Sequence, residues 1–339
     1  MNFIEFNLRL ACMLFLLVCT SNGRIIQDVE KGVIAKKIIV DQNGQGNFTS
    51  LQKAIDSIPS NNSVWTKIYI KAAIYKEKVV IPKDKPFIIL QGESIQKTIV
   101  EWQEAGSSTE SSTFILHADN FVAVDLLFRN TYNLVLPRRP DGNEIKWAPA
   151  ATLYSDKASF YRCGFAGVQD TLTDYRGRHY FNSCYIEGAV DFIWGAGQSV
   201  FEKCEINATI GVLKGSTGFI TAQGRVNEND SSGYVFLGGK ISANGPFYLG
   251  RAYTQFSRVI FKDTYIPQAV VPQGWEPWKS VGHEGTIIFS EVSCSGPGSN
   301  TSERVKWEKN LPLDELNKLV NINTFINEDG WIEGQPTIQ

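Results

Sequence analysis

A short apolar pattern recurs along the chain, and bends of polar and small residues separate its copies. In each copy a phenylalanine is followed three residues later by a small residue and five residues later by an apolar residue, most loosely in the first copy. The copies begin at Phe121, Phe160, Phe181, Phe201, Phe236 and Phe261. Alternating apolar runs between Gly- and Asn-rich bends are typical of β-strands, and their recurrence at intervals of about 20 to 35 residues indicates a repeat architecture.

Three of these copies, at Phe160, Phe181 and Phe201, follow one another closely, so the unit is about 21 residues long. A unit of this length can hold three short strands and three bends, which make one coil of a parallel β-helix. Successive coils would stack at a strand spacing of about 4.8 Å, so equivalent positions would lie side by side. A β-sandwich is the main alternative, but its antiparallel hairpins do not predict one motif repeated at a fixed phase. We therefore predict an all-β solenoid, a parallel β-helix.

Helical patterning is rare in this sequence. The clearest segment, residues 48–59 (FTSLQKAIDSIP), places Leu51, Ala54, Ile55 and Ile58 on one face. We expect it to form a short helix that caps the N-terminal end of the stack, because a terminal coil would otherwise expose its core. A second helix is predicted at residues 311–320 (LPLDELNKLV).

The first 23 residues have the features of a secretory signal peptide. Arg9 precedes an apolar run from Leu10 to Cys19, and small or polar residues follow up to Gly23. The run is shorter than the roughly 20 apolar residues of a membrane span, although a membrane anchor is the alternative. We therefore expect a secreted, extracellular protein without a membrane segment after signal removal, and five Asn-x-Ser/Thr sequons are compatible with glycosylation.

Overall charge narrows the range of partners. The chain of 339 residues carries 33 basic and 35 acidic residues, a net charge of −2, and 43% of its residues are hydrophobic. The apolar fraction is sufficient for a large core. The balanced charge gives no support to nucleic-acid binding, which usually shows a basic surplus.

Removal of the signal peptide would leave four cysteines, namely Cys163, Cys184, Cys204 and Cys294. The first three take the same position in successive units, so we expect an internal ladder of small residues. An oxidising compartment permits disulfides, and neighbouring coils are close enough for one, so a disulfide and a stack of free thiols both remain open. The spacing does not resemble a zinc site, and we expect no metal and no cofactor.

Two aspartates also take the same place in successive units. Asp170 and Asp191 each follow the cysteine of their unit by seven residues, and they are 21 residues apart. One coil would therefore separate them, and we expect them side by side at about 5 Å. Two carboxylates that close cannot both ionise cheaply, so one should hold a proton near neutral pH while the other stays charged. That asymmetry supplies a general acid and a nucleophile or base at one place.

The alternative is a ladder of aspartates that only form hydrogen bonds within their turns. The aromatic and apolar neighbours of both aspartates favour the catalytic interpretation. A strip of aromatic residues could also stack on the faces of sugar rings, although packing accounts for most single aromatic residues. This candidate strip consists of Tyr175, Phe192, Trp194 and Tyr253.

Several longer motifs resemble, in order, those of plant pectin methylesterases. They are IYKEKVVI (74–81), GVQDTL (167–172), GAVDFIWG (188–195), ITAQGR (220–225), YLGRAY (248–253) and PQGWEPW (272–278). The resemblance extends from about Lys37 to the C-terminus. It implies a right-handed parallel β-helix, which agrees with the stacking expected from the repeats.

The signal-peptide pattern and the resemblance together divide the chain into three parts. These are a signal peptide (1–23), a short leader (24–36) and a pectinesterase-like β-helix domain (37–339). Longer members of the family carry an inhibitor-like region before this domain, and we expect that region to be absent here, because only a short stretch follows the signal peptide.

Four residues of these motifs receive a role from the resemblance. Asp191 would be the nucleophile that attacks the methyl-ester carbonyl of a galacturonate unit. Asp170 would protonate the leaving methanol and then deprotonate the incoming water. Gln169 would donate a hydrogen bond to the oxyanion, and Arg251 would pair with Asp191 and hold it ionised. The predicted substrate contacts, three of which belong to the aromatic strip, are Thr113, Tyr175, Phe192, Tyr253 and Trp275.

The chain departs from the family pattern at the second oxyanion glutamine. An ungapped count puts Trp147 at that position, in KWAPAATLYSD, and no glutamine lies nearby. Loss of one oxyanion donor costs about 10²- to 10³-fold in rate. Smaller departures are Ala73, Trp194 and the pair Ala252-Tyr253, where the family has Gly, Phe and Pro-Trp.

We therefore predict a carboxylic ester hydrolase that removes methyl esters from cell-wall pectin (homogalacturonan) and releases methanol and free galacturonate. Its expected partners are pectin and a proteinaceous pectinesterase inhibitor, and the protein itself is expected to be a monomer. One alternative is a weak or inactive β-helix that binds pectin without hydrolysing it. Another is a pectin-cleaving glycosidase or lyase, because carboxylates about 5 Å apart also occur in retaining glycosidases. A serine esterase is disfavoured, since the chain has no Gly-x-Ser-x-Gly turn.

Overall fold

Residues 32–134 and 145–337 are described by a computed structural model. The predicted signal peptide (1–23) lies outside these residues, and so does most of the predicted leader (24–36).

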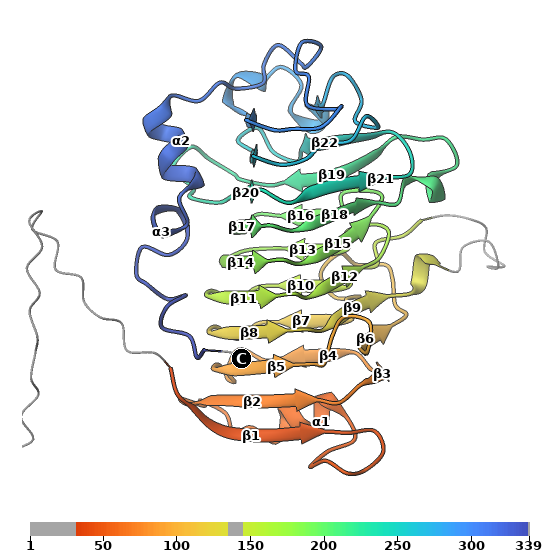
Figure 1. Ribbon diagram of the computed structural model, residues 1–339, viewed down its shortest axis with the longest axis vertical. Coiled ribbons are helices and arrows are strands. Elements are labelled where there is room, and N and C mark those ends of the chain that lie inside the picture. Colours follow the sequence, from red (N-terminus) through yellow and green to blue (C-terminus); the bar gives the residue numbers. More distant parts are fainter. Residues whose placement is uncertain (1–31, 135–144, 338–339) are drawn as a thin grey trace, which may run out of the picture. The chain divides into compact units, whose positions relative to one another are not determined.

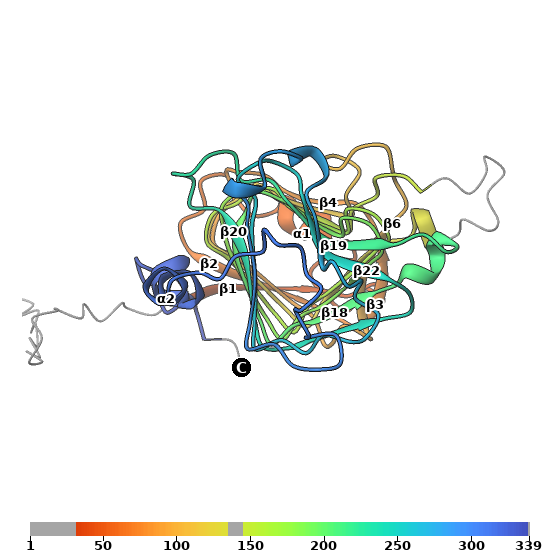
Figure 2. The same ribbon diagram turned by 90° about the horizontal axis from the view of Figure 1, so that it is seen from above.

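The described chain winds repeatedly through three sheets, so that neighbouring strands of a sheet come from successive coils (Figure 1). Every pairing between these strands is parallel. Seen from above, the sheets enclose a common interior (Figure 2). This arrangement confirms the predicted all-β parallel β-helix.

Within each sheet, the strands pair in the order in which they occur along the chain. The ten-stranded sheet consists of β1 (Ile34–Val40), β2 (Trp65–Ile70), β5 (Ile88–Gln91), β8 (Phe121–Val124), β11 (Ala158–Tyr161), β14 (Arg178–Asn182), β17 (Gln198–Glu202), β20 (Gly233–Leu237), β23 (Arg258–Lys262) and β25 (Ile288–Val292). The eight-stranded sheet consists of β4 (Val79–Ile81), β7 (Phe114–Leu116), β10 (Ala151–Leu153), β13 (Leu172–Asp174), β16 (Ile193–Gly195), β19 (Gly218–Gln223), β22 (Phe247–Ala252) and β24 (Trp275–Glu276). The seven-stranded sheet consists of β3 (Ala73–Lys76), β6 (Thr98–Trp102), β9 (Leu127–Asn130), β12 (Gly164–Ala166), β15 (Tyr185–Gly188), β18 (Glu205–Ala208) and β21 (Lys240–Ala243).

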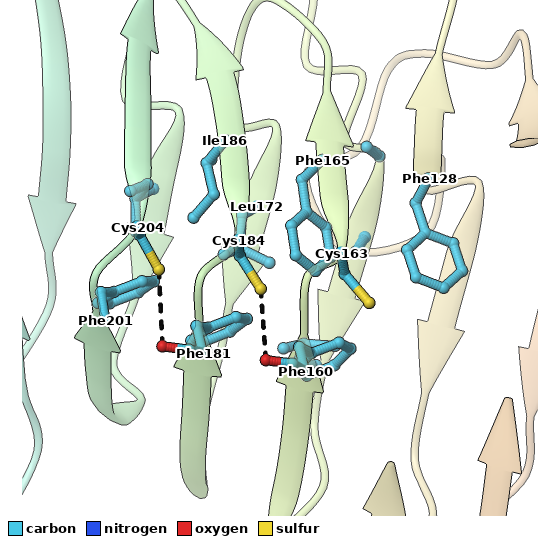
Figure 3. Packing of buried hydrophobic residues seen from close by; sticks show 14 of the residues in the cluster. Phe128, Phe160, Cys163, Phe165, Leu172, Phe181, Cys184, Ile186, Phe201 and Cys204 are labelled. Carbon is cyan, nitrogen blue, oxygen red and sulfur yellow. Dashed lines mark hydrogen bonds between the residues drawn. The ribbon is translucent and has the colours of Figure 1, made fainter. Parts of the chain in front are cut away.

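Stacked phenylalanine rings fill the interior at the position that opens each repeat (Figure 3). The ring centroids of Phe160 and Phe181 are 5.0 Å apart, and those of Phe181 and Phe201 are 4.6 Å apart. The stack continues through Phe236 and Phe261, with spacings of 4.6 and 4.2 Å. Burial of one such side chain contributes about 1.5–3 kcal/mol, and favourable ring geometry adds about 0.5–1.5 kcal/mol. A coil that slipped by one residue would lose this stack, so the rings help to fix the register.

The bend between the ten-stranded and the seven-stranded sheets has the same backbone conformation in most coils. The residue that directly precedes the small residue of the repeat has a left-handed backbone. Its φ is 50° at Arg162, 55° at Ser183, 54° at Lys203, 54° at Asp263 and 52° at Ser293. Non-glycine residues seldom adopt this conformation, so its recurrence indicates that stacking imposes it. Equal bends keep equivalent residues of neighbouring coils in line.

The four cysteines of the described residues are free thiols, which answers the question that the sequence left open. The Cys184 thiol donates to the Phe160 carbonyl at 3.3 Å, and the Cys204 thiol donates to the Phe181 carbonyl at 3.6 Å (Figure 3). Each sulfur is thus bonded to the backbone of the preceding coil. Burial raises the pKa of the Cys184 thiol well above its usual range, so this group stays protonated and inert.

The N-terminal helix α1 (Leu51–Asp56) packs beside β1 and β4 at the start of the stack (Figure 1). Its apolar face is buried in the core. The Ser50 side chain caps it, and the Glu77 carboxylate accepts the backbone N–H of Leu51 at 2.8 Å. The helix is shorter than the segment 48–59 that the apolar pattern marked, because the cap at Ser50 sets its start and Ser57 ends it.

Two further helices, α2 (Leu313–Val320) and α3 (Ile322–Phe325), lie outside the coil near the ten-stranded sheet (Figures 1 and 2). Leu316 and Phe325 pack with outward side chains of that sheet. Short 3₁₀ helices occur at Ile210–Leu213, Trp278–Ser280 and Glu284–Thr286. Within residues 32–134 and 145–337, no helix has the length and apolar character needed to cross a membrane.

Thiol titration tests the free-cysteine ladder. Protein that lacks residues 1–23, purified without reductant and then unfolded in guanidinium, is expected to show four reactive thiols, because none is bonded to another. The buried thiols of the folded protein should not react. Two or fewer thiols after unfolding, or a lower melting temperature in the presence of reductant, would contradict the ladder.

Candidate active site

Asp170 and Asp191 occupy the bends that lead into β13 and β16. Gln169 forms a parallel bridge with Val190, and the Asp170 backbone N–H donates to the Val190 carbonyl at 3.1 Å. The aspartates are therefore one coil apart and in register, as their spacing in the sequence predicts. Both have a left-handed backbone, with φ of 56° and 48°, and their exposed fractions are 4% and 5%. Aspartate and asparagine tolerate this conformation better than most other residues.

Arg251 of β22 binds both oxygens of Asp191. Its Nε donates to Oδ1 at 2.7 Å and its Nη2 donates to Oδ2 at 2.6 Å. The guanidinium lies between two aromatic rings, 4.1 Å from the centroid of Phe219 and 3.8 Å from that of Trp278. A bidentate ion pair fixes the orientation of the carboxylate, and the rings fix the plane of the guanidinium.

The two carboxyl groups have different surroundings. The Ser108 hydroxyl donates to Asp170 Oδ2. The pKa of Asp170 is raised to about 7: burial is the largest cause and the charge of Asp191 adds to it, whereas the hydrogen bond from Ser108 and the charge of Arg251 oppose the rise. Burial also raises the pKa of Asp191, but the hydrogen bonds and charge of Arg251 oppose this effect. Asp170 can therefore hold a proton near neutral pH beside a carboxylate that an arginine neutralises.

Gln169 lines a surface pocket beside the aspartates. The pocket has a volume of about 340 Å³, and its other lining residues are Gly106, Ile145, Lys146 and Trp147. The Trp147 side chain is 52% exposed, and its carbonyl accepts the Gly106 N–H at 2.9 Å. The structure thus brings Trp147 to the same pocket as the oxyanion candidate Gln169, in agreement with the position that the ungapped count gave it.

Six aromatic rings follow one another along the eight-stranded sheet, mostly at the carboxyl ends of its strands. This aromatic row consists of His117, Tyr154, Tyr175, Trp194, Tyr253 and Trp278. Centroids of neighbouring rings are between 4.7 and 6.1 Å apart. The sequence pointed to Tyr175, Trp194 and Tyr253. It missed His117, Tyr154 and Trp278. His117 and Tyr154 come directly after the paired strands β7 and β10, so their equivalent positions in neighbouring coils could have revealed them.

Three predicted substrate contacts lie inside the coil instead. Phe192 and Thr113 have no exposed surface, and Trp275 is 1% exposed. The Thr113 hydroxyl donates to the Arg129 carbonyl at 2.9 Å, and Trp275 packs against Phe289. The left-handed backbone at Asp191 turns the next side chain inward, so Phe192 contributes to the core and not to the surface beside its neighbour.

One other arrangement of polar residues is excluded as a catalytic site. Asp174, His179 and Ser155 have the composition of a catalytic triad, but all three are fully buried. His179 Nε2 lies 2.9 Å from the Ser155 carbonyl and 3.5 Å from its hydroxyl, so the ring does not activate the serine. Within residues 32–134 and 145–337, no group of three His, Cys, Asp or Glu side chains is placed to hold a metal ion.

The fold is a parallel β-helix that carries a pair of carboxyl groups, one of them bound by an arginine, at the bends before β13 and β16. The sequence pattern of the family described as Pectinesterase matches residues 37–333. The chain belongs to the pectinesterase family, as its motifs indicated.

Individual relatives support this assignment over nearly the whole chain. The Arabidopsis thaliana protein named Probable pectinesterase 29 is 44% identical over 324 residues, which are 95% of this chain and 96% of that protein. Probable pectinesterase 55 of the same plant is 46% identical over 301 residues, 88% of this chain and 91% of that protein. The solved structure of a pectin methylesterase from carrot matches with a TM-score of 0.81 at 28% identity and covers 90% of this chain and 97% of the carrot chain.

Replacement of Asp170 by asparagine tests the raised pKa of its carboxyl group. The folded pKa of about 7 lies above the ordinary value of 3.8, so ionisation of Asp170 destabilises the folded protein as the pH rises between these values. Asp170→Asn removes this effect and suits the left-handed backbone. Relative to wild type, its free energy of unfolding in urea is expected to rise by on the order of 3 kcal/mol between about pH 4.5 and about pH 7.5.

The exposed acid Glu328, changed to glutamine, serves as the control and should give no such rise. If wild type and Asp170→Asn respond equally to pH, the Asp170 carboxyl titrates in its ordinary range and the argument for a stored proton fails.

Proposed function

We propose that this protein hydrolyses the methyl esters of pectin, with Asp191 as the nucleophile and Asp170 as the acid and base. The observation that carries the proposal is the asymmetry of the two carboxyl groups. Arg251 binds both oxygens of Asp191, whereas the pKa of Asp170 is raised to about 7. Ester hydrolysis of this kind needs a charged nucleophile beside a group that releases and regains a proton near neutral pH.

In the first half of the reaction, a carboxylate oxygen of Asp191 attacks the carbonyl carbon of the ester and forms a tetrahedral oxyanion. Asp170 gives its proton to the methoxy oxygen as the bond between that oxygen and the acyl carbon breaks. Methanol leaves, and the galacturonyl group remains joined to Asp191 as an anhydride. Asp170 is then a carboxylate.

In the second half, water attacks the same acyl carbon and Asp170 takes a proton from that water. The bond to Asp191 breaks, which restores the Asp191 carboxylate and the protonated Asp170 and leaves a galacturonic acid unit. Throughout, Gln169 donates a hydrogen bond to the oxyanion, a contribution of about 3 kcal/mol in comparable sites. Arg251 orients Asp191 before attack, and the ion pair between them forms again when the anhydride breaks.

The aromatic row offers ring faces on which the sugar units of pectin can stack. Cations lie over it at two places: Arg176 over Tyr154 at 5.7 Å and Lys279 over Tyr253 at 4.1 Å. These charges suit a polymer whose de-esterified units carry carboxylates. The proposal includes secretion, action in the cell wall as a monomer, and a proteinaceous pectinesterase inhibitor as a protein partner.

Replacement of the nucleophile tests the proposal directly. Asp191→Asn is expected to lower methanol release from highly methyl-esterified pectin by about 10³-fold or more, because the amide cannot form the anhydride. Asp263→Asn is the matched control, since Asp263 has the same left-handed backbone, with φ of 54°, but is exposed on another bend. Equal methanol release by the two variants would refute the assignment of Asp191. New reducing ends or unsaturated ends without methanol would favour a glycosidase or a lyase.

Replacement of Trp147 tests the missing oxyanion donor and the alternative of a pectin-binding protein. Trp147→Gln is expected to raise kcat for methanol release by up to about 10²-fold, because an amide in the pocket of Gln169 adds a donor. Trp147→Leu, which adds no donor, is the control and should not accelerate the reaction. If neither wild type nor Trp147→Gln releases methanol while both bind pectin, the chain is a binder.

A further inference from the structure

A loop rich in hydroxyl groups, residues 104–112, lies between β6 and β7 and contacts the site. Its own side chains hold its conformation. Ser107 Oγ accepts the backbone N–H of Thr109 at 3.3 Å and that of Glu110 at 3.1 Å. Ser111 Oγ accepts the backbone N–H of Ser107 at 3.1 Å. The loop is therefore an ordered turn with few free groups.

Buried side chains of neighbouring coils fix the position of this loop. The Asn130 amide, which is 1% exposed, donates to the carbonyls of Glu104 at 2.9 Å and Ser111 at 3.1 Å. The hydroxyl of the buried Thr152 donates to the Ser108 carbonyl at 3.3 Å. Because the backbone on both sides of Ser108 is bound in this way, the side chain of Ser108 has a defined place.

That place is against the carboxyl group of Asp170. The Ser108 hydroxyl donates to Oδ2, although 62 residues separate the two positions. A hydroxyl has a single proton to donate. While Oδ2 accepts it, proton binding at Oδ2 is disfavoured, and the proton that Asp170 carries belongs on Oδ1.

We propose that Ser108 is a positioning residue for the ester hydrolysis, which holds Asp170 Oδ2 so that Oδ1 carries and transfers the proton. This inference rests on the proposed function, in which Asp170 protonates methanol and later accepts a proton from water. A carboxyl group free to rotate would present its proton to the methoxy oxygen for only part of the time. The loop thus supplies a hydroxyl on the side of the site where Trp147 stands in place of a second glutamine.

The test compares Ser108→Ala, Ser108→Thr and Ser107→Ala in methanol release from highly methyl-esterified pectin across pH. Ser108→Ala is expected to lower kcat by about ten-fold with little change in KM, because one hydrogen bond to a charged or protonating group is lost. Loss of the bond also raises the pKa of Asp170, so the alkaline limb of the kcat profile should move up by about 0.5 to 1 pH unit. Ser108→Thr, which keeps the hydroxyl, should restore both quantities.

Ser107→Ala controls for disturbance of the loop, since Ser107 binds only the loop itself among the contacts described above. It should leave the alkaline limb where it is in the wild type. The inference is overturned if active wild type and Ser108→Ala share the same kcat and limb, if Ser107→Ala moves the limb as far, or if Ser108→Ala changes KM alone.

Carboxyl ¹³C NMR of aspartate-labelled protein provides a readout that does not require turnover. The resonance assigned to Asp170 by its loss in Asp170→Asn should titrate at higher pH in Ser108→Ala than in wild type. An unchanged titration would refute the contact itself. Wild-type protein that releases no methanol overturns the proposed function, and the inference then falls with it, whereas an active wild type with an unaffected Ser108→Ala overturns the inference alone.

Discussion

The register between successive coils is the constraint on which the site depends. Stacked rings such as Phe160, Phe181 and Phe201 occupy the same interior position, and the bend after each of them repeats the same left-handed backbone conformation. Parallel hydrogen bonding then transmits this alignment to every position of the coil. Asp170 and Asp191 meet because of that alignment, since the backbone of one is bonded to the coil of the other.

Register brings the aspartates together, and the neighbours that reach them from other coils make them chemically different. Both have the same backbone conformation and nearly the same burial. Asp191 faces Arg251, which comes from a strand two positions further along its sheet. Asp170 instead faces Ser108, from the loop before β7. Similar coils therefore hold two carboxyl groups with different chemistry at one place, because different side chains from other coils contact each of them.

The sequence predicted those features that follow from periodicity. The interval between Asp170 and Asp191 is a coil length, so the β-helix and the pairing of the two residues could be inferred together. The motif around Arg251 indicated this arginine as a third residue of the candidate site. Contacts that depend on loops could not be inferred in this way. Ser108 reaches Asp170 through a turn whose path is set by buried side chains, and no spacing rule connects positions 62 residues apart.

The burial of three predicted substrate contacts has a related cause. Phe192 follows a left-handed residue, and the alternation of inward and outward side chains in a strand does not hold through such a bend. Proximity in sequence to the candidate nucleophile Asp191 therefore carried no information about the exposure of Phe192. Trp275 begins the short strand β24, and Thr113 directly precedes the short strand β7. For strands this short, the sequence does not indicate whether a side chain points into the coil or outward.

The coils of this stack differ in length, and the difference has an evolutionary meaning. Ala158 pairs with residues 121 and 179, so one turn of the chain takes 37 residues and the next takes 21. Gln198 and Gly233 pair across 35. The architecture thus absorbs large insertions wherever the chain can leave the surface between strands. Between Asp170 and Asp191 the strands β13, β14 and β15 are joined by short bends, and an insertion there keeps the two acids in register only if it leaves the surface at one of those bends. Selection on this interval therefore acts on where the chain can lengthen.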